Sequence, residues 1–175
     1  MTIAGPSMEN HPPQTIGDDL AEWRARAKDT NVHATTLLAT DYLNHFNEIV
    51  MLLGMVADMP EMLDDCRAWT PKSYVEHFRG SGVPDAEFAV EAYAHSPAQF
   101  RRPFDQTIGM LNATVASVIE RASKAQADGE PDLLRSICGF GSEALQRLID
   151  TASAIIHGSE DTASQAQIDR ILQGR

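Results

Sequence analysis

The sequence predicts an all-α protein, a helical bundle of three or four main helices with short inserted helices. Three observations predict this class. Apolar residues recur every three or four positions in three long stretches, which is the spacing of one helix face. No stretch alternates apolar and polar side chains as a half-buried strand does. Prolines, glycines and capping residues divide the rest of the chain into short segments.

Length and charge limit the classes of function. A chain of 175 residues is long enough for one domain with a single core. Its 14 basic and 25 acidic residues give a net charge of −11, which argues against nucleic acid or an anionic membrane as the main partner, because both require a positive surface. Cys66 and Cys138 have no CxxC partner, so we expect free thiols in a reducing compartment. The first residues lack the pattern of a secretory signal, and we expect a cytoplasmic protein.

The N-terminal third contains the central helix of the predicted bundle. Residues 1–15 are rich in proline and poor in large apolar side chains, and we expect a disordered arm. A short helix is expected over 18–28. The central helix is expected over 36–59, where residues 49–56 are apolar on nearly every side. A helix that is apolar all round must be covered by protein or lipid, and this run is too short to cross a bilayer.

Short helices are predicted between residues 60 and 97. Proline fits the first turn of a helix, because that turn leaves its N–H groups unpaired in any case. Prolines occupy four such positions, and the expected helices are 60–69, 72–79, one that starts at Pro84 and one that starts at Ser96-Pro97. We expect these short helices to pack across the bundle.

Two further long helices complete the predicted core, at 104–127 and 132–156, with a turn at 128–131 between them. Pro103 is expected to kink or restart the first of them. Gly139-Phe140-Gly141 is expected to interrupt the second; without a preceding strand it indicates a packing notch or kink rather than a phosphate loop. The predicted bundle domain is 16–158, followed at 159–175 by an acidic linker and a short helix.

One polar face on the central helix is a candidate metal site. Asp41, His45 and Glu48 are spaced i, i+4 and i+7, so they share a helix face. Carboxylate and imidazole groups together can bind a divalent transition metal or act as an acid–base pair. Ferritin-like di-iron bundles carry Glu-x-x-His motifs, whereas this chain has the reverse order at His45 and no Glu-x-x-His. The alternative is a polar face that contacts only solvent or the N-terminal arm.

The remaining histidines and methionines have simpler interpretations. His77 lies among aromatic residues and is expected in the core, whereas His95 is expected to form a surface pair with Glu91. His157 is expected to face solvent. The sequence leaves open whether these histidines converge with His45. The methionines at 51, 55 and 59 indicate an adaptable face that could join copies of the chain into a homo-oligomer.

The C-terminal segment is predicted to be a short amphipathic helix that docks on a partner. Ser164 and Gln167 form a capping box, and an acidic linker precedes them. Ile168, Ile171 and Leu172 form one apolar edge, which is typical of a helix that binds in a groove. The alternative is that this helix folds back on its own bundle.

Five residues of this segment also match a known docking pattern: Ser164, Gln165, Ile168, Asp169 and Leu172, with Ile171 in place of a leucine. The segment resembles the peptide by which flagellar motor switch proteins and chemotaxis phosphatases bind a phosphorylated response regulator. The resemblance implies a receiver domain as the partner. The Asp-Leu-Thr-Gly-Gln stretch of the phosphatases is not found on the long helices, so no phosphatase activity is carried over.

No motif of a catalytic nucleophile, zinc protease or phosphate-binding loop occurs in the chain. We therefore expect a non-enzymatic regulatory or interaction protein that docks through its C-terminal peptide. The alternatives are a metal-binding bundle, enzymatic or for storage, that uses His45 with its neighbouring carboxylates, and a structural oligomer.

Overall fold

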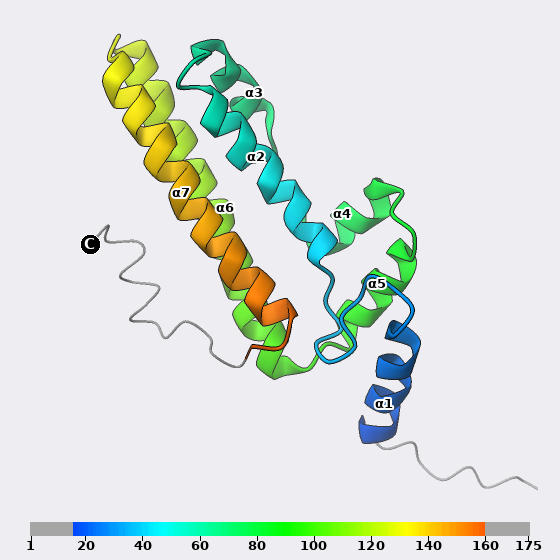
Figure 1. The fold of residues 1–175 in the computed structure, drawn as a ribbon. Coiled ribbons are helices and arrows are strands. Elements are labelled where there is room, and N and C mark those ends of the chain that lie inside the picture. The colour runs from blue at the N-terminus through cyan, green and yellow to red at the C-terminus, as the bar shows by residue number, and fades with distance from the viewer. Residues whose placement is uncertain (1–15, 160–175) are drawn as a thin grey trace, which may run out of the picture.

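The computed structural model describes residues 16–159, and within them the protein is all-α (Figure 1). The elements in chain order are α1 (Ile16–Ala27), η1 (Thr40–Leu43), α2 (Asn44–Met55), η2 (Pro60–Met62), α3 (Leu63–Ala68), α4 (Tyr74–Ser81), α5 (Ala86–Ala94), α6 (Ala98–Ala127) and α7 (Pro131–Ile156), where η denotes a 3-10 helix. The only β pairing within these residues is an isolated bridge between Val32 and Ala39. The predicted arm at 1–15 and residues 160–175 lie outside the described part.

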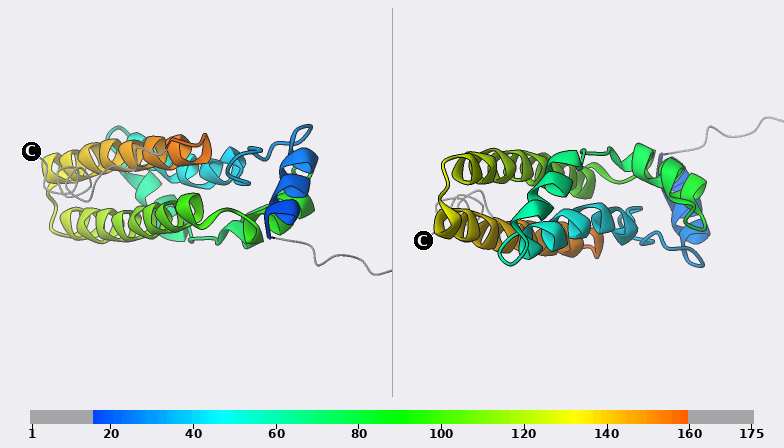
Figure 2. Two further views of the ribbon diagram at one scale, coloured as in Figure 1. Left: turned by 90° about the horizontal axis from the view of Figure 1, so that it is seen from below. Right: turned by 90° about the horizontal axis from the view of Figure 1, so that it is seen from above.

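Helices α6 and α7 form a long antiparallel hairpin, and α2 lies along α7 (Figure 1). The turn between α6 and α7 is tight, with Gly129 at a φ of 72°. Helices α1 and α5 pack together at one end of this hairpin (Figure 2), where Trp23 and Phe88 stack with ring centroids 5.7 Å apart. The long helices therefore build the body of the protein, and the short ones cover one end and one side.

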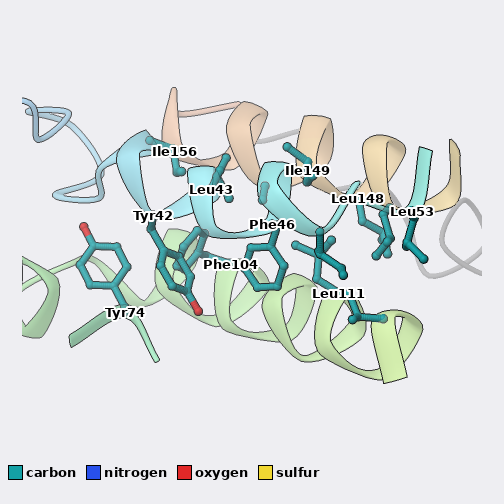
Figure 3. Packing of buried hydrophobic residues seen from close by; sticks show 14 of the residues in the cluster. Tyr42, Leu43, Phe46, Leu53, Tyr74, Phe104, Leu111, Leu148, Ile149 and Ile156 are labelled. Atoms are coloured by element: carbon teal, nitrogen blue, oxygen red, sulfur yellow. The ribbon is translucent and has the colours of Figure 1, made fainter. Parts of the chain in front are cut away.

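The core lies between α2, α6 and α7 (Figure 3). Phe46, Ile49 and Leu53 of α2 are completely buried, and they meet Leu111 of α6 and Leu148 of α7. Burying a side chain of this size contributes about 1.5–3 kcal/mol relative to leaving it exposed. The 3.6-residue periodicity of the sequence therefore identified the correct core faces of all three helices.

The central helix is shorter than the prediction of 36–59. Residues 32–39 form a tight loop instead, in which the His33 amide donates to the Leu38 carbonyl at 2.8 Å. Leu37 has a φ of 58°, a left-handed conformation that cannot be part of a right-handed helix, so the helical segment begins only after it. The Thr36 hydroxyl donates to the Ile156 carbonyl at 2.6 Å, so the loop is tied to the end of α7.

The predicted cover around residues 49–56 is also incomplete. Met51 is 61% exposed and Gly54 is exposed, so α2 has a solvent face within its most apolar part. Within residues 16–159 the chain itself therefore leaves part of this run uncovered, although α7, α3, η1 and η2 pack against α2. Cover by a second copy of the chain stays a prediction.

Neither long helix is interrupted at the expected position. Helix α6 starts at Ala98 and continues through Pro103, so it does not restart there, and Phe100 and Phe104 on either side of the proline are both buried. Helix α7 likewise continues through Gly139 and Gly141. None of the helices within residues 16–159 combines the length and apolarity that a membrane crossing requires.

The two cysteines are free and buried, as the sequence predicts. Burial raises the pKa of the Cys66 thiol to about 11, so the thiol stays protonated and unreactive at neutral pH. Both cysteines therefore act as small core residues.

Candidate functional site

The three residues of the predicted metal site point to different surroundings. His45 is 5% exposed and stacks on Trp69, with ring centroids 4.5 Å apart. Asp41 lies in η1, where its carboxylate accepts a hydrogen bond of 2.6 Å from the Asn31 amide. Glu48 is exposed on α2. The three side chains therefore do not share one environment: His45 is in the core, Asp41 contacts a loop and Glu48 faces solvent.

His45 is held as a neutral core imidazole. Burial lowers its pKa, and the positive charge of Lys72 lowers it further. Its Nε2 atom is buried and has no hydrogen-bond partner in the structure. His77 is the nearest other histidine, with ring centroids 6.3 Å apart, and burial lowers its pKa as well. The pair therefore sits in an aromatic environment that disfavours charge.

No group of three or more His, Cys, Asp or Glu side chains within residues 16–159 is arranged to hold a metal ion. Asp41, His45 and Glu48 are not brought together as ligands, because α2 turns His45 toward Trp69 while Glu48 faces solvent. The metal-binding alternative gains no support from the geometry of this part of the chain.

The other histidines do not converge on His45. His95 stacks on Trp23 with ring centroids 4.3 Å apart, and its expected partner Glu91 instead pairs with Arg26 at 3.6 Å. His157 is exposed, as expected, and its ring meets His33 edge-on at 5.6 Å. The histidines of residues 16–159 therefore lie in three separate places.

A groove between α6 and α7, with a volume of about 770 Å³, is the candidate site that the described residues offer for a partner. Every residue that lines it belongs to one of these two helices: Met110, Ala113, Thr114, Ser117, Val118, Arg121, Leu133, Ser136, Ile137, Phe140, Gly141, Ala144 and Arg147. We call it the α6–α7 groove. Its volume lies within the usual range of about 300–1,000 Å³ for binding pockets.

The groove exposes large apolar side chains. Phe140 is 73% exposed and Leu133 is 46% exposed, although α7 buries a full apolar stripe on its other side. A protruding phenylalanine beside a hollow is the kind of anchor that protein interfaces bury at their centre. Among residues 16–159, α7 therefore presents two apolar faces, and the core of these residues uses only one of them.

Gly141 permits the close packing that forms the floor of the groove. It is buried, and a Cβ atom at this position would lie 2.7 Å from both methyl carbons of Val118. Gly139, two residues earlier, lies on nearly the opposite side of α7, and a Cβ atom there would meet nothing within 4 Å. The Gly139-Phe140-Gly141 segment is therefore a packing notch at Gly141 within a continuous helix.

The rims of the groove are basic in an acidic protein. Arg121 of α6 and Arg147 of α7 both line it. Arg147 has one weak partner, Glu143 at 3.9 Å with both side chains half exposed or more, and Arg121 makes none of the ion pairs within residues 16–159. Exposed pairs of this kind hold a charge only weakly. Both arginines are thus available to carboxylates on a bound segment.

Sequence reasoning missed this groove, although one indication was present. Phe140 falls outside the apolar stripe that its own helix directs into the core, and such a residue either packs on a partner or remains exposed. The predicted docking residues Ser164, Gln165, Ile168, Asp169, Ile171 and Leu172 lie outside the described residues.

Comparisons with protein-family models, with curated proteins and with solved structures found no match for this chain. The functional conclusion therefore rests on the geometry above and on the sequence of the C-terminal segment.

Proposed function

We propose that this protein is a non-enzymatic regulatory protein that docks on a partner protein in the cytoplasm. The observation that carries the proposal is the α6–α7 groove, with the exposed side chain of Phe140 beside it. Two free, buried cysteines agree with a reducing compartment. The partner we propose is a receiver domain, which the resemblance of residues 164–172 to a receiver-binding peptide suggests.

In this proposal the groove receives an amphipathic helix of the partner with acidic residues beside its apolar edge. Apolar side chains of that helix cover Phe140 and Leu133, and its carboxylates pair with Arg121 and Arg147. The peptide at 164–172 supplies a second contact. Two linked contacts raise the overall affinity, because the second one forms within the complex.

The test is a calorimetric titration of the full-length chain with purified receiver domains of the same organism, phosphorylated and unphosphorylated. We expect the phosphorylated form to bind. Phe140→Ala should weaken binding about tenfold or more, because a buried phenylalanine contributes about 1.5–3 kcal/mol. Met51→Ala removes another exposed apolar side chain, from α2, and should leave binding unchanged.

Two results would contradict the proposal: no receiver domain binds, or Phe140→Ala binds as well as the wild type. Deleting residues 159–175 tests the peptide separately, and unchanged affinity would remove it from the proposal. Measuring the mass in solution tests the alternative of a homo-oligomer. A dimer that Met51→Ala dissociates would place the interface on the methionine face of α2, whereas one that Phe140→Ala dissociates would place it at the groove.

A further inference from the structure

The α6–α7 groove has the dimensions of one short helix. Its wall on α7 is a stripe of residues at steps of three or four: Leu133, Ile137, Phe140, Ala144 and Arg147. Helix α6 forms the facing wall with the same spacing, at Met110, Thr114, Ser117 and Arg121. At a rise of 1.5 Å per residue the α7 wall is about 21 Å long, and the C-terminal segment, residues 164–172, would be about 13 Å long as a helix.

The described chain ends beside this groove. Ala154 lies seven residues after Arg147 and so continues the same stripe of α7. Gly158 has a φ of 84°, and the Ser159 amide donates to the Ala154 carbonyl at 3.0 Å, which turns the chain back at the end of α7. Ser164 follows Ser159 by five residues, which span at most about 17 Å. Arg147 is only about 10 Å from Ala154 along α7, so the C-terminal segment can enter the groove at Arg147 and run antiparallel to α7.

Entry at Arg147 brings the apolar edge of the C-terminal segment onto the ring of Phe140. Ile171 lies seven residues after Ser164, and Phe140 lies seven residues before Arg147, so the two side chains come level in antiparallel helices. Phe140 is 73% exposed, and its ring is therefore open to contact. The other two apolar residues of the edge lie within one turn of Ile171.

The linker before the segment has the charge that the entrance of the groove requires. Glu160 and Asp161 lie between the end of the described chain and the C-terminal segment. Arg147 is exposed and lines the groove where the segment enters. Its ion pair with Glu143 at 3.9 Å is weak because both side chains are exposed to solvent. A linker carboxylate therefore meets an arginine that is only weakly paired.

A second pair of charges falls on the wall of α6. In a right-handed helix Asp169 follows Ile168 by about 100°, which turns it toward α6 when the segment runs antiparallel to α7. Val118 of α6 lies against Gly141, so Arg121 comes about one turn from Asp169 along the groove, within the reach of its long side chain. Arg121 makes none of the ion pairs within residues 16–159.

We propose that the C-terminal segment occupies the α6–α7 groove of its own chain while no partner is bound. Its apolar edge covers Phe140, Asp169 pairs with Arg121, and the acidic linker passes Arg147. The attachment favours this contact, because a short linker gives an attached segment a millimolar effective concentration. A receiver domain must then displace the segment before it can use the groove. This consequence rests on the proposed function, whereas occupancy of the groove does not.

The experiment places a nitroxide spin label on the full-length chain at Gly174→Cys and records two-dimensional NMR spectra without a partner. Both native cysteines are buried and stay unlabelled. The amide signals of Leu133 and Phe140 should broaden more than that of Met51, which lies on the solvent face of α2. No broadening at Phe140, or equal broadening at Phe140 and Met51, would overturn the proposal.

Two variants of the labelled chain test the apolar contact. Phe140→Ala should lower the equilibrium constant for occupancy about tenfold and reduce the broadening at Leu133, because it removes the ring that the segment covers. Met51→Ala removes an exposed apolar side chain outside the groove and should leave the broadening unchanged. If Phe140→Ala retains the full broadening, the segment does not bind on this ring and the proposal fails.

A charge exchange tests the pairing across the groove. Arg121→Glu should reduce the broadening at Leu133, and addition of Asp169→Arg to the same chain should restore it, because the two charges then attract again. Arg135→Glu makes the same charge change on α7 outside the groove and should have no effect. Restoration is a result that a merely structural role of Arg121 would not produce, and equal effects of Arg121→Glu and Arg135→Glu would overturn the assigned pair.

The remaining occupants of the groove are separated by two further measurements. In an equal mixture of isotope-labelled chains without the spin label and spin-labelled chains without the isotope, broadening at Leu133 would show that the segment comes from a second copy, and would overturn the proposal. Adding the phosphorylated receiver domain should reduce the broadening, and binding without this loss would overturn the displacement. Occupancy is measured without a partner, so a failure of receiver binding contradicts only the proposed function, and an empty groove contradicts only this inference.

Discussion

The close contact of α6 and α7 at Gly141 predicts that alanine has opposite effects at two nearby glycines of α7. In a helix interior, replacing glycine with alanine stabilises by about 1 kcal/mol, and this gain should appear in Gly139→Ala, where the new methyl group meets open space. In Gly141→Ala the same gain is opposed by a Cβ atom placed 2.7 Å from two carbons of Val118.

The contact at Gly141 cannot be relieved cheaply. Val118 is short and β-branched, so it keeps one side-chain rotamer within a helix and cannot swing away. The two helices must separate instead, and overpacking of this kind costs about 1–3 kcal/mol. We therefore expect Gly141→Ala to have an unfolding free energy about 2 kcal/mol below that of Gly139→Ala, or a Tm about 4–8 °C lower for a chain of this size.

The assay is urea unfolding followed by circular dichroism at 222 nm, with both variants and the wild type at one pH and one salt concentration. Adding Val118→Ala to Gly141→Ala should restore part of the loss, because it removes the two carbons that the new methyl group meets. If Gly141→Ala proves as stable as Gly139→Ala, the helices do not approach as closely as described and the reasoning is refuted.

Two further predictions concern buried polar groups. Burial lowers the pKa values of His33, His45 and His77 below the usual 6.5, so the unfolded chain binds more protons than the folded one at acidic pH. The unfolding free energy should therefore fall as the pH drops below about 6.5. An unfolding free energy that is flat from about pH 8 to pH 5 would contradict this prediction. Thr36→Val should lower the unfolding free energy by about 1–3 kcal/mol, because it leaves the carbonyl of Ile156 at the end of α7 unpaired. Thr35→Val, at an exposed position, should change the unfolding free energy by less than about 0.5 kcal/mol. Equal effects of the two variants in urea unfolding would exclude the buried hydrogen bond as the cause.

Helix type and core face could be predicted from the sequence, because both depend on the local spacing of apolar residues. Helix α1, the short helices after Pro60 and the hairpin turn at 128–131 follow the local rules for caps, prolines and glycines. The start of the central helix could not be predicted by these rules. Residues 32–39 fold into a loop because of hydrogen bonds to α7 and to Ser96, which are distant in sequence.

The candidate sites show the same division. Helical spacing suggested that Asp41, His45 and Glu48 share one face. It could not show that Asp41 lies in η1, before α2 begins, or that His45 turns toward Trp69 on another segment. The groove at Phe140 depends on which side of the α6–α7 hairpin the rest of the chain covers. Tertiary packing decides which side is covered. In the sequence, the only indication was that Phe140 lies outside the apolar stripe that faces the core.

The hydrogen bond from Thr36 to Ile156 joins residues 120 positions apart, so the N-terminal half of the core can be completed only late in the synthesis of the chain. The apolar face of α2 leaves the ribosome early, yet the part of α7 that covers it is made about 100 residues later. At about 5–20 residues per second this delay lasts roughly 5–20 s. During that time the first half of the protein depends on chaperones or on its own weak local contacts, whereas α6 and α7, being neighbours, can pair as soon as they emerge. A chain truncated before Leu148 therefore lacks a side chain that covers Phe46, Ile49 and Leu53 in the core.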